Sequence, residues 1–316
     1  MTTVTPQDKT SPRHGGATAP ARSWFHALRS VVWHVRSRPY GLAAITWLYM
    51  LWALLPVIIA MKFSFNAGRS ISAWQGFDLT RWYWSDPVLS VWQNSGLQSA
   101  LFQSLTLAGL AILVATPIGV LLALGLARWR GRGQRPANFL MLFPLVTPEI
   151  VLAVALYMVF MHIFVFINPS TIAQMLGQVT FALAYVVIVV RGRLASIGMQ
   201  YEEAAADLGA TRLEMFTKVL VPLMMPAIVA SAMIVFAISI DNFVITQWLS
   251  CGSGCDTIPV RVYSAARSSP LPSINALATI MVFMSVTAVA LGFGAYRFLT
   301  RHERARTPIN DDKGDH

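Results

Sequence analysis

The feature that most constrains this chain is a series of apolar segments, each long enough to cross a lipid bilayer. A spanning helix needs about 20 mostly apolar residues at about 1.5 Å rise per residue. Six segments meet this requirement: Gly41–Met61, Ser104–Ala127, Asn138–Phe164, Ile172–Val190, Pro226–Leu249 and Ile274–Leu299. A mean hydropathy of +0.56, with only 12% charged residues, excludes an ordinary soluble globular protein. The sequence therefore predicts an all-α, multi-pass protein of the cell (inner or plasma) membrane, with six transmembrane helices.

The distribution of Lys and Arg predicts the orientation of these spans. Placing both termini in the cytoplasm puts nineteen of the 24 basic residues on the inner side and five outside. Cytoplasmic loops carry such an excess of positive charge. The net charge of +10 is therefore explained by membrane topology, and we expect no nucleic-acid partner.

The segments that flank the six-span region, residues 40–300, have a different character. Residues 1–21 are rich in Thr, Ser, Pro and Gly, which predicts a disordered tail. Residues 22–39 place apolar side chains at helical spacing opposite Arg residues, which predicts an amphipathic helix in the membrane interface. This helix would either only anchor the chain beside the membrane or have a regulatory role. Residues 301–316 are polar and charged, and we expect a cytoplasmic tail.

A polar stretch of about thirty residues, 196–225, separates the fourth and fifth apolar segments. Ser196–Leu208 is helix-forming, and Gly209 supplies a residue for the left-handed position that ends a helix. Thr211 and Glu214 have the spacing of a capping box, which predicts that a second helix begins at once, while Pro222 and Pro226 lie where we expect that helix to stop. On these residues alone, the stretch could be a helical hairpin that only joins two spans.

The same stretch also fits a longer pattern, E-A-A, three residues, Gly, nine residues, then I-x-L-P. The chain has Glu203-Ala204-Ala205, Gly209 and Val219-Leu220-Val221-Pro222, with Val for Ile and Val for Leu. This resembles the cytoplasmic coupling loop of ABC importer permeases of the type I fold. The resemblance implies that 202–222 docks on a separate ATPase subunit. The two alanines would allow close approach, and Glu202, Glu203 and Asp207 would offer carboxylates.

Two acidic residues, Glu149 and Asp241, lie within the apolar segments. A carboxylate at bilayer depth is costly, so such residues usually face a protein interior or a water-filled path. Glu149 follows Pro148, with Pro144 one turn earlier, and these prolines would open the third helix. Neither span carries a Lys or Arg near its acid, which favours a cationic substrate as the missing partner. The alternative is that both acids are hydrogen-bonded structural residues at an interface with a second subunit.

Further motifs resemble the second permease subunit of spermidine/putrescine ABC importers over most of 41–299. They are Ser64-Phe65-Asn66, Trp74-Gln75-Gly76-Phe77, Trp82-Tyr83, Thr147-Pro148-Glu149-Ile150-Val151, Ile240-Asp241-Asn242, Ile258-Pro259-Val260-Arg261-Val262-Tyr263-Ser264 and Asn275-Ala276-Leu277-Ala278-Thr279-Ile280. The resemblance implies polyamine uptake by alternating access. It also implies a second homologous permease, two cytoplasmic ATPase subunits and an extracytoplasmic binding protein. Two departures are Asp78 for Thr, and Asn242 for a second Asp, which puts the choice between diamine and triamine in doubt.

The predicted substrate path thus comprises Glu149, Asp241 and Asn242, with Tyr157 and Trp248 available for cation–π contact. Single aromatic residues near span ends are, however, also typical of membrane interfaces.

The chain contains no G-x-x-x-x-G-K-[ST] phosphate loop, so we expect it to be a transport subunit and not an enzyme. ATP and Mg²⁺ would be bound by the partner ATPase, and this chain would hold no cofactor. Other ABC substrates, such as iron(III), remain open, as does a proton-coupled secondary transporter that uses Glu149 or Asp241 as a relay. The two cysteines, Cys251 and Cys255, either form a loop-closing disulfide on the outer side or remain free, and two cysteines alone do not predict a metal site.

Overall fold

The computed structural model describes residues 39–304 except 71, 130, 253 and 269–271. The predicted disordered tail, the predicted amphipathic helix before Pro39 and the tail after Arg304 lie outside these residues. The chain divides into two compact units, 1–58 and 59–316, which are described separately. The described part of the first unit belongs to the long helix α2 (Pro39–Ser64), which continues into the second unit.

The described secondary-structure elements of the second unit are helices joined by loops, with one isolated antiparallel bridge between Asn66 and Phe77. After α2 its elements are the π-helical turn η1 (Arg81–Ser85), α3 (Ser95–Arg128), α4 (Gln134–Val146), α5 (Glu149–His162), α6 (Thr171–Ile197), α7 (Gln200–Asp207), α8 (Arg212–Glu214), the π-helical turn η2 (Met215–Leu220), α9 (Val221–Ile240), α10 (Val244–Trp248), α11 (Ile258–Ser268) and α12 (Pro272–Arg304).

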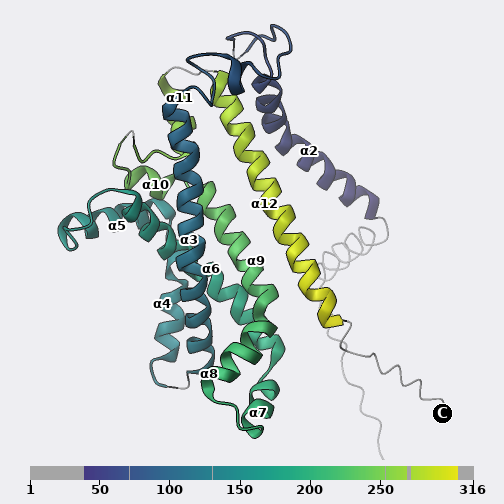
Figure 1. Cartoon of the computed structure of the whole chain (residues 1–316), viewed down its shortest axis with the longest axis vertical. Helices are drawn as coiled ribbons and strands as arrows, with labels where there is room; N and C mark the ends of the chain where they lie inside the picture. The colour runs from purple at the N-terminus through teal and green to yellow at the C-terminus, as the bar shows by residue number, and fades with distance from the viewer. Residues whose placement is uncertain (1–38, 71, 130, 253, 269–271, 305–316) are drawn as a thin grey trace, which may run out of the picture. The chain divides into compact units, whose positions relative to one another are not determined.

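Helices α3, α6 and α9 pack against one another and form the core of this unit (Figure 1). Small side chains line their contact, among them Ala111, Ala115 and Ala123 of α3. At Gly119 a Cβ atom would lie 2.5 Å from a methyl carbon of Val186, so α3 and α6 approach too closely there for any larger residue. Small residues at helix contacts are what a membrane bundle requires, because lipid offers no hydrophobic drive for association.

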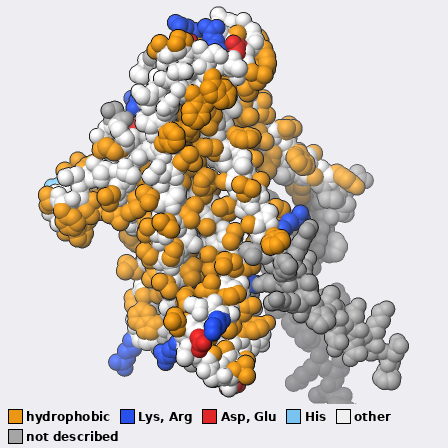
Figure 2. All heavy atoms as spheres, viewed as in Figure 1, with side chains coloured by type: hydrophobic (Ala, Val, Ile, Leu, Met, Phe, Trp, Pro, Cys, Tyr) orange, Lys and Arg blue, Asp and Glu red, His pale blue; other side chains and the backbone are white. Residues whose placement is uncertain are grey.

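The described residues include five helices that are long and apolar enough to cross a membrane, or six if the bent pair α4–α5 forms one span. Figure 2 shows charged side chains mainly at the two ends of the face in view, with a hydrophobic band between them. The prediction of an all-α membrane protein is therefore confirmed.

The predicted third span is not one helix. Helices α4 and α5 meet at an angle of 108°. The break lies at Thr147, which has ψ 130 and precedes Pro148. A residue before proline is pushed out of the helical region, and proline itself has no N–H to donate, so the helix ends there. Pro144, one turn earlier, lies inside α4 without ending it.

The predicted boundaries around the fifth span were also wrong at both ends. Pro222 and Pro226 do not end the preceding helix, because helical structure continues from Arg212 to Ile240 through α8, η2 and α9. At its other end, α9 ends at Ile240 and a separate short helix, α10, follows after three residues.

Candidate functional site

The coupling segment forms the short helix α7 and the turn into α8, at the end of α3 opposite to α11 (Figure 1). Helix α7 begins at Gln200 and not at the predicted Ser196, because Gly198, with φ 73, separates it from α6. Gly209 has φ 79, which confirms its predicted left-handed conformation. The N–H groups of Gly209 and Ala210 donate to the carbonyls of Ala206 (2.9 Å) and Ala205 (3.0 Å), the paired bonds of a Schellman motif.

The next helix begins with the predicted capping box. The Thr211 hydroxyl accepts from the Glu214 N–H at 3.3 Å, and the Glu214 carboxylate accepts from the Thr211 N–H at 3.2 Å. The carboxylate of Glu214 also binds Lys218 one turn later, at 2.9 Å. The turn between α7 and α8 is thus fixed by local bonds that the sequence itself encodes.

Helix α7 presents two faces of different character. Ala205 is buried, and Glu202 pairs with Arg128 at the end of α3, so these two residues face the protein. Glu203, Ala204, Asp207 and Gly209 are exposed, as is the side chain of Leu208. The prediction from the sequence assigned both Glu202 and Glu203 as carboxylates that contact a partner. In the structure, Glu202 is already paired with Arg128 of the same chain. Pro222 lies in the first turn of α9, at the other end of the segment.

Three of the predicted path residues, Glu149, Asp241 and Asn242, lie at two breaks in the helices, and these breaks meet. Glu149 begins α5, and Asn242 follows the end of α9; the Asn242 side-chain amide donates to a carboxylate oxygen of Glu149 at 2.5 Å. The Asn242 side-chain oxygen accepts from the N–H groups of Ile245 (3.1 Å) and Thr246 (3.3 Å), so it also holds the start of α10. Asn242 is buried and joins the two broken helices.

Asp241 differs from Glu149 in its surroundings. It is exposed, and its carboxylate has no hydrogen-bond or ion-pair partner among the described residues. Glu149 is partly buried and has Asn242 as a donor, so the expectation of two unpartnered acids holds for Asp241 alone. Tyr157 of α5 and Trp248 of α10 lie against each other, with ring centroids 6.3 Å apart. The five predicted path residues therefore lie on or beside α5, α9 and α10, of which α5 and α10 pack against each other.

Two buried glutamines of α6, which the sequence analysis missed, hold the second break. The Gln174 side chain donates to the carbonyls of Thr246 (2.9 Å) and Cys255 (3.0 Å) and accepts from Gln103 (2.9 Å). Gln178 accepts from the Ser239 hydroxyl in the last turn of α9. A polar residue within an apolar span could have drawn attention to them, but glutamine carries no charge and neither residue belongs to a known motif.

The motifs that follow α2 form a compact segment at the α11 end of α3. The buried side chain of Asn66 accepts from the Gln75 N–H (2.8 Å), and its carbonyl accepts from the indole N–H of Trp82 (2.6 Å). Asp78 accepts from the N–H groups of Thr80 (2.8 Å) and Arg81 (3.0 Å), which hold the pKa of this carboxyl below its ordinary value. This departure from the family motif therefore has a structural role, because Asp78 holds the turn that leads into η1.

The structure joins Cys251 and Cys255 by a disulfide, with their Cα atoms 5.5 Å apart. The short loop between them includes Gly252 at φ 92. The Cys255 carbonyl accepts from Gln174, so the same glutamine that supports α10 also anchors this loop. Among the described residues no group of three or more His, Cys, Asp or Glu side chains could hold a metal ion.

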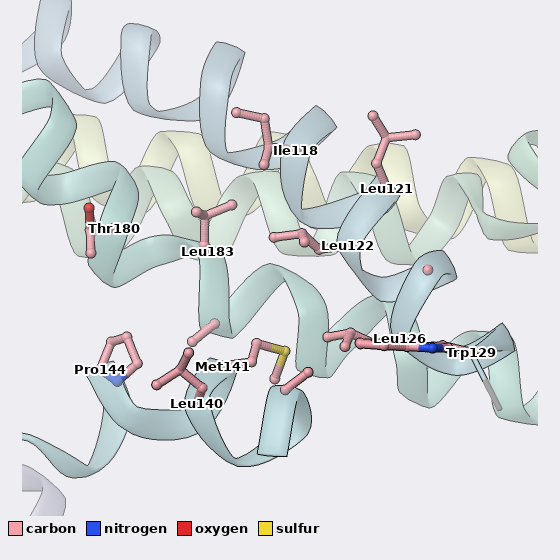
Figure 3. Close-up of a pocket in the computed structure, with 13 residues that line it drawn as sticks. Ile118, Leu121, Leu122, Leu126, Trp129, Leu140, Met141, Pro144, Thr180 and Leu183 are labelled. Atoms are coloured by element: carbon pink, nitrogen blue, oxygen red, sulfur yellow. The ribbon is translucent and has the colours of Figure 1, made fainter. Parts of the chain in front are cut away.

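An apolar cavity of about 840 Å³ lies between α3, α4 and α6 (Figure 3). Leu122 of α3, Met141 of α4 and Leu183 of α6 are among the side chains that face it, and its described lining residues are apolar apart from the Thr180 hydroxyl and the indole N–H of Trp129. The cavity contains none of the predicted path residues. The described lining residues carry no charge, which does not suit a cationic substrate, so we do not assign the transport path to this cavity.

Comparison with known proteins identifies relatives for most of the chain. Residues 115–305 match the family described as binding-protein-dependent transport system inner membrane component. The spermidine/putrescine transport system permease protein PotC of Haemophilus influenzae is 35% identical over 237 residues, which cover 75% of this chain and 89% of that protein. The putrescine transport system permease protein PotI of Escherichia coli is 34% identical over 257 residues, covering 79% and 88%.

Solved structures share the fold at low sequence identity, and one of them is representative. It is the bacterial alginate ABC transporter in complex with an alginate pentasaccharide-bound periplasmic protein. A chain of that structure aligns with a TM-score of 0.62 at 19% identity, covering 87% of this chain and 96% of its own length. At this identity the likeness supports the fold alone.

Proposed function

Because this chain belongs to the family of binding-protein-dependent transport system inner membrane components, we propose that it is the permease subunit of an ATP-driven importer of polyamines. Two relatives, each at least 34% identical, are named as permeases for spermidine and putrescine or for putrescine alone. Their names support the substrate class, and the chemistry of the helix breaks supports it independently.

The observation that carries this proposal is the meeting of two interrupted helices at the Glu149–Asn242 contact. Transporters build substrate sites from discontinuous helices, because the break frees polar groups within the membrane. Here the break supplies one exposed carboxylate, Asp241, and a second carboxylate with a neutral donor, Glu149. A polyamine carries separated ammonium groups, and each could replace a missing positive partner.

The aromatic pair Tyr157 and Trp248 supports the same cargo. An ammonium group or its methylene chain binds well against aromatic rings, and Trp is the strongest cation–π partner. Tyr157 lies on α5, the helix that Glu149 begins, and Trp248 lies on α10, which follows Asp241 by three residues. An anionic cargo would instead call for Lys or Arg side chains, and none occurs in α5, α9 or α10.

The energy source would be a separate pair of ATPase subunits that bind ATP and Mg²⁺. Their docking surface would be the exposed face of α7, with Glu203 and Asp207 as charged contacts and Ala204 and Leu208 as apolar ones. Closure of the ATPases would move α7, and the motion would reach the path through α8, η2 and α9. A second permease of similar fold and an extracytoplasmic binding protein complete the assembly that we propose.

The experiment is uptake into proteoliposomes that contain this chain purified with its partner permease and ATPase, with binding protein added outside. We expect radiolabelled spermidine or putrescine to accumulate only with ATP at the ATPase side. Asp241→Asn should lower the rate about tenfold, equivalent to ~1.4 kcal/mol of lost cation binding. Accumulation of iron(III) without polyamine would reject the substrate class. Uptake driven by a proton gradient without nucleotide would reject the ATP-driven mechanism.

A further inference from the structure

The ion pair between Arg128 and Glu202 connects two elements that are far apart along the chain. Arg128 lies in the last turn of α3, and Glu202 lies in the first turn of α7. A guanidinium nitrogen of Arg128 contacts a carboxylate oxygen of Glu202, and the two side chains are only 31% and 12% exposed. Each charge also suits its own helix end, since cations favour C-termini and anions favour N-termini.

This contact lies on the inner face of α7. Glu202 and Ala205 are three residues apart, so they share one side of the helix, and Ala205 is buried. Glu203 and Asp207 share the opposite, exposed side. Helix α7 therefore has one face free for a partner protein and another held against its own chain.

Helix α3 is suited to carry movement from this contact to the far end of the unit. Its 34 residues extend about 51 Å as one helix, at 1.5 Å per residue. At the far end the Ser104 hydroxyl accepts from the N–H of Ile258, the first residue of α11, at 2.9 Å. The neighbouring Gln103 donates to Gln174, which in turn supports α10 and the disulfide loop.

We infer that the Arg128–Glu202 pair is a strut that transmits movement of α7 directly to α3, and through α3 to α10 and α11. Arg128 and Glu202 are thus positioning residues for coupled transport, beside the covalent route through α8, η2 and α9. The inference rests on the proposed function, because it assigns a role in coupling ATP hydrolysis to uptake. It also explains why the first Glu of the coupling helix faces inward and only the second faces a partner.

The test measures ATP hydrolysed per polyamine imported by the reconstituted assembly. Glu202→Gln keeps the side-chain shape and removes the charge, and it should raise this ratio at least about fivefold, within the usual range of coupling between sites. The exchange Arg128→Glu with Glu202→Arg restores an ion pair and should return the ratio toward that of the original protein. Arg132→Gln is the matched control, since Arg132 is an exposed arginine that follows α3. It should leave the ratio unchanged.

A second measurement does not depend on cargo. Hydrogen exchange of the α7 amides in the purified chain should become faster in Glu202→Gln than in Arg132→Gln. Equal exchange in these two variants would overturn the strut, whatever the chain transports. An unchanged hydrolysis ratio in Glu202→Gln, with normal ATP-driven uptake by the original protein, would also overturn it. Failure of the original protein to import polyamines would instead reject the proposed substrate.

Discussion

Asn242 makes two kinds of contact at once, and its amide supplies both the acceptor and the donor. Its oxygen accepts from two N–H groups at the start of α10, and its nitrogen donates to Glu149. An ionised aspartate could still accept from both N–H groups, but it would have nothing to donate. Alanine would lose both contacts and leave the start of α10 without its acceptor.

We predict that Asn242→Asp makes uptake depend on pH. Two carboxylates at 2.5 Å cannot both be ionised without strong repulsion, so the pair would have to hold one proton. Uptake by the variant should therefore be higher at acidic pH, where the proton is shared, and fall as the pH rises. Uptake measured across the neutral range, beside the original protein and Asn242→Ala, checks this. A profile that matches the original protein would show that Glu149 does not face residue 242 during transport.

Gly209 is the second position at which one residue type is required. A Cβ atom there would meet no atom within 4 Å, so the requirement is its φ of 79 and not space. We predict that Gly209→Ala costs about 1–2 kcal/mol at the turn, the usual penalty for a left-handed alanine. Thermal unfolding should detect this loss, and looser attachment of α7 should raise the ATP hydrolysed per imported cargo.

Gly192 of α6 provides the control for Gly209. A Cβ atom there would also meet nothing within 4 Å, and Gly192 lies inside a helix. Alanine at 192 should therefore stabilise the chain, by up to about 1 kcal/mol. Equal unfolding temperatures for Gly209→Ala and Gly192→Ala would contradict the proposed role of the turn.

Among the elements, the π-helical turn η2 explains how a helix continues through Pro222. Proline has no N–H, so the i→i+4 bond to residue 218 cannot form. The chain instead uses a wider turn, in which the N–H of Val221 donates to the carbonyl of Phe216, five residues earlier. Such turns insert one extra residue into a helix and are frequent at functional sites.

We predict that Pro222→Ala lets η2 revert to α-helix. The extra residue of the wide turn would then become part of the regular helix, which would rotate the segment before it by roughly 100° relative to α9, at 3.6 residues per turn. Leu220, which is buried, and the coupling helix α7 would then lose their present contacts. Hydrogen exchange of 215–221 should slow as regular bonds form, while ATP-driven uptake falls. Pro226→Ala is the control, because Pro226 lies inside α9 beyond the π-helical turn.

The elements also show which features the sequence could predict. The turn from α7 to α8 depends on Gly209, Thr211 and Glu214, which act through bonds to near neighbours, so their spacing was sufficient. The bend between α4 and α5 was partly signalled by Pro148. The break after α9 has no proline or glycine. It is held by Gln174, Gln178 and Asn242, whose side chains bind residues more than sixty positions away in the sequence. Local patterns carry no record of such contacts.

At the scale of the whole molecule, the bend between α4 and α5 decides how the chain crosses the membrane. If the bent pair crosses once, residues 39–304 cross six times and the two termini lie on one side. If the pair enters and leaves on the same side, five crossings remain and the termini lie on opposite sides. The distribution of Lys and Arg favours six crossings, with α7 in the cytoplasm.

We predict that α7 and both termini face the cytoplasm, while the Cys251–Cys255 loop faces outside. In a chain with both native cysteines replaced by Ser, single cysteines at Ala204, near the N-terminus at Ser11 and near the C-terminus at Asp315 should react with a membrane-impermeant maleimide only in inside-out vesicles. A single Cys251, the exposed cysteine of the loop, should react only in intact cells or right-side-out vesicles. With four spans between them, the N-terminus and α7 lie on the same side of the membrane; with three, they lie on opposite sides. Labelling of Ser11→Cys and Ala204→Cys from opposite sides would therefore mean that α4–α5 is re-entrant. Labelling of both from outside would place the coupling helix beyond the reach of a cytoplasmic ATPase and remove the proposed energy source.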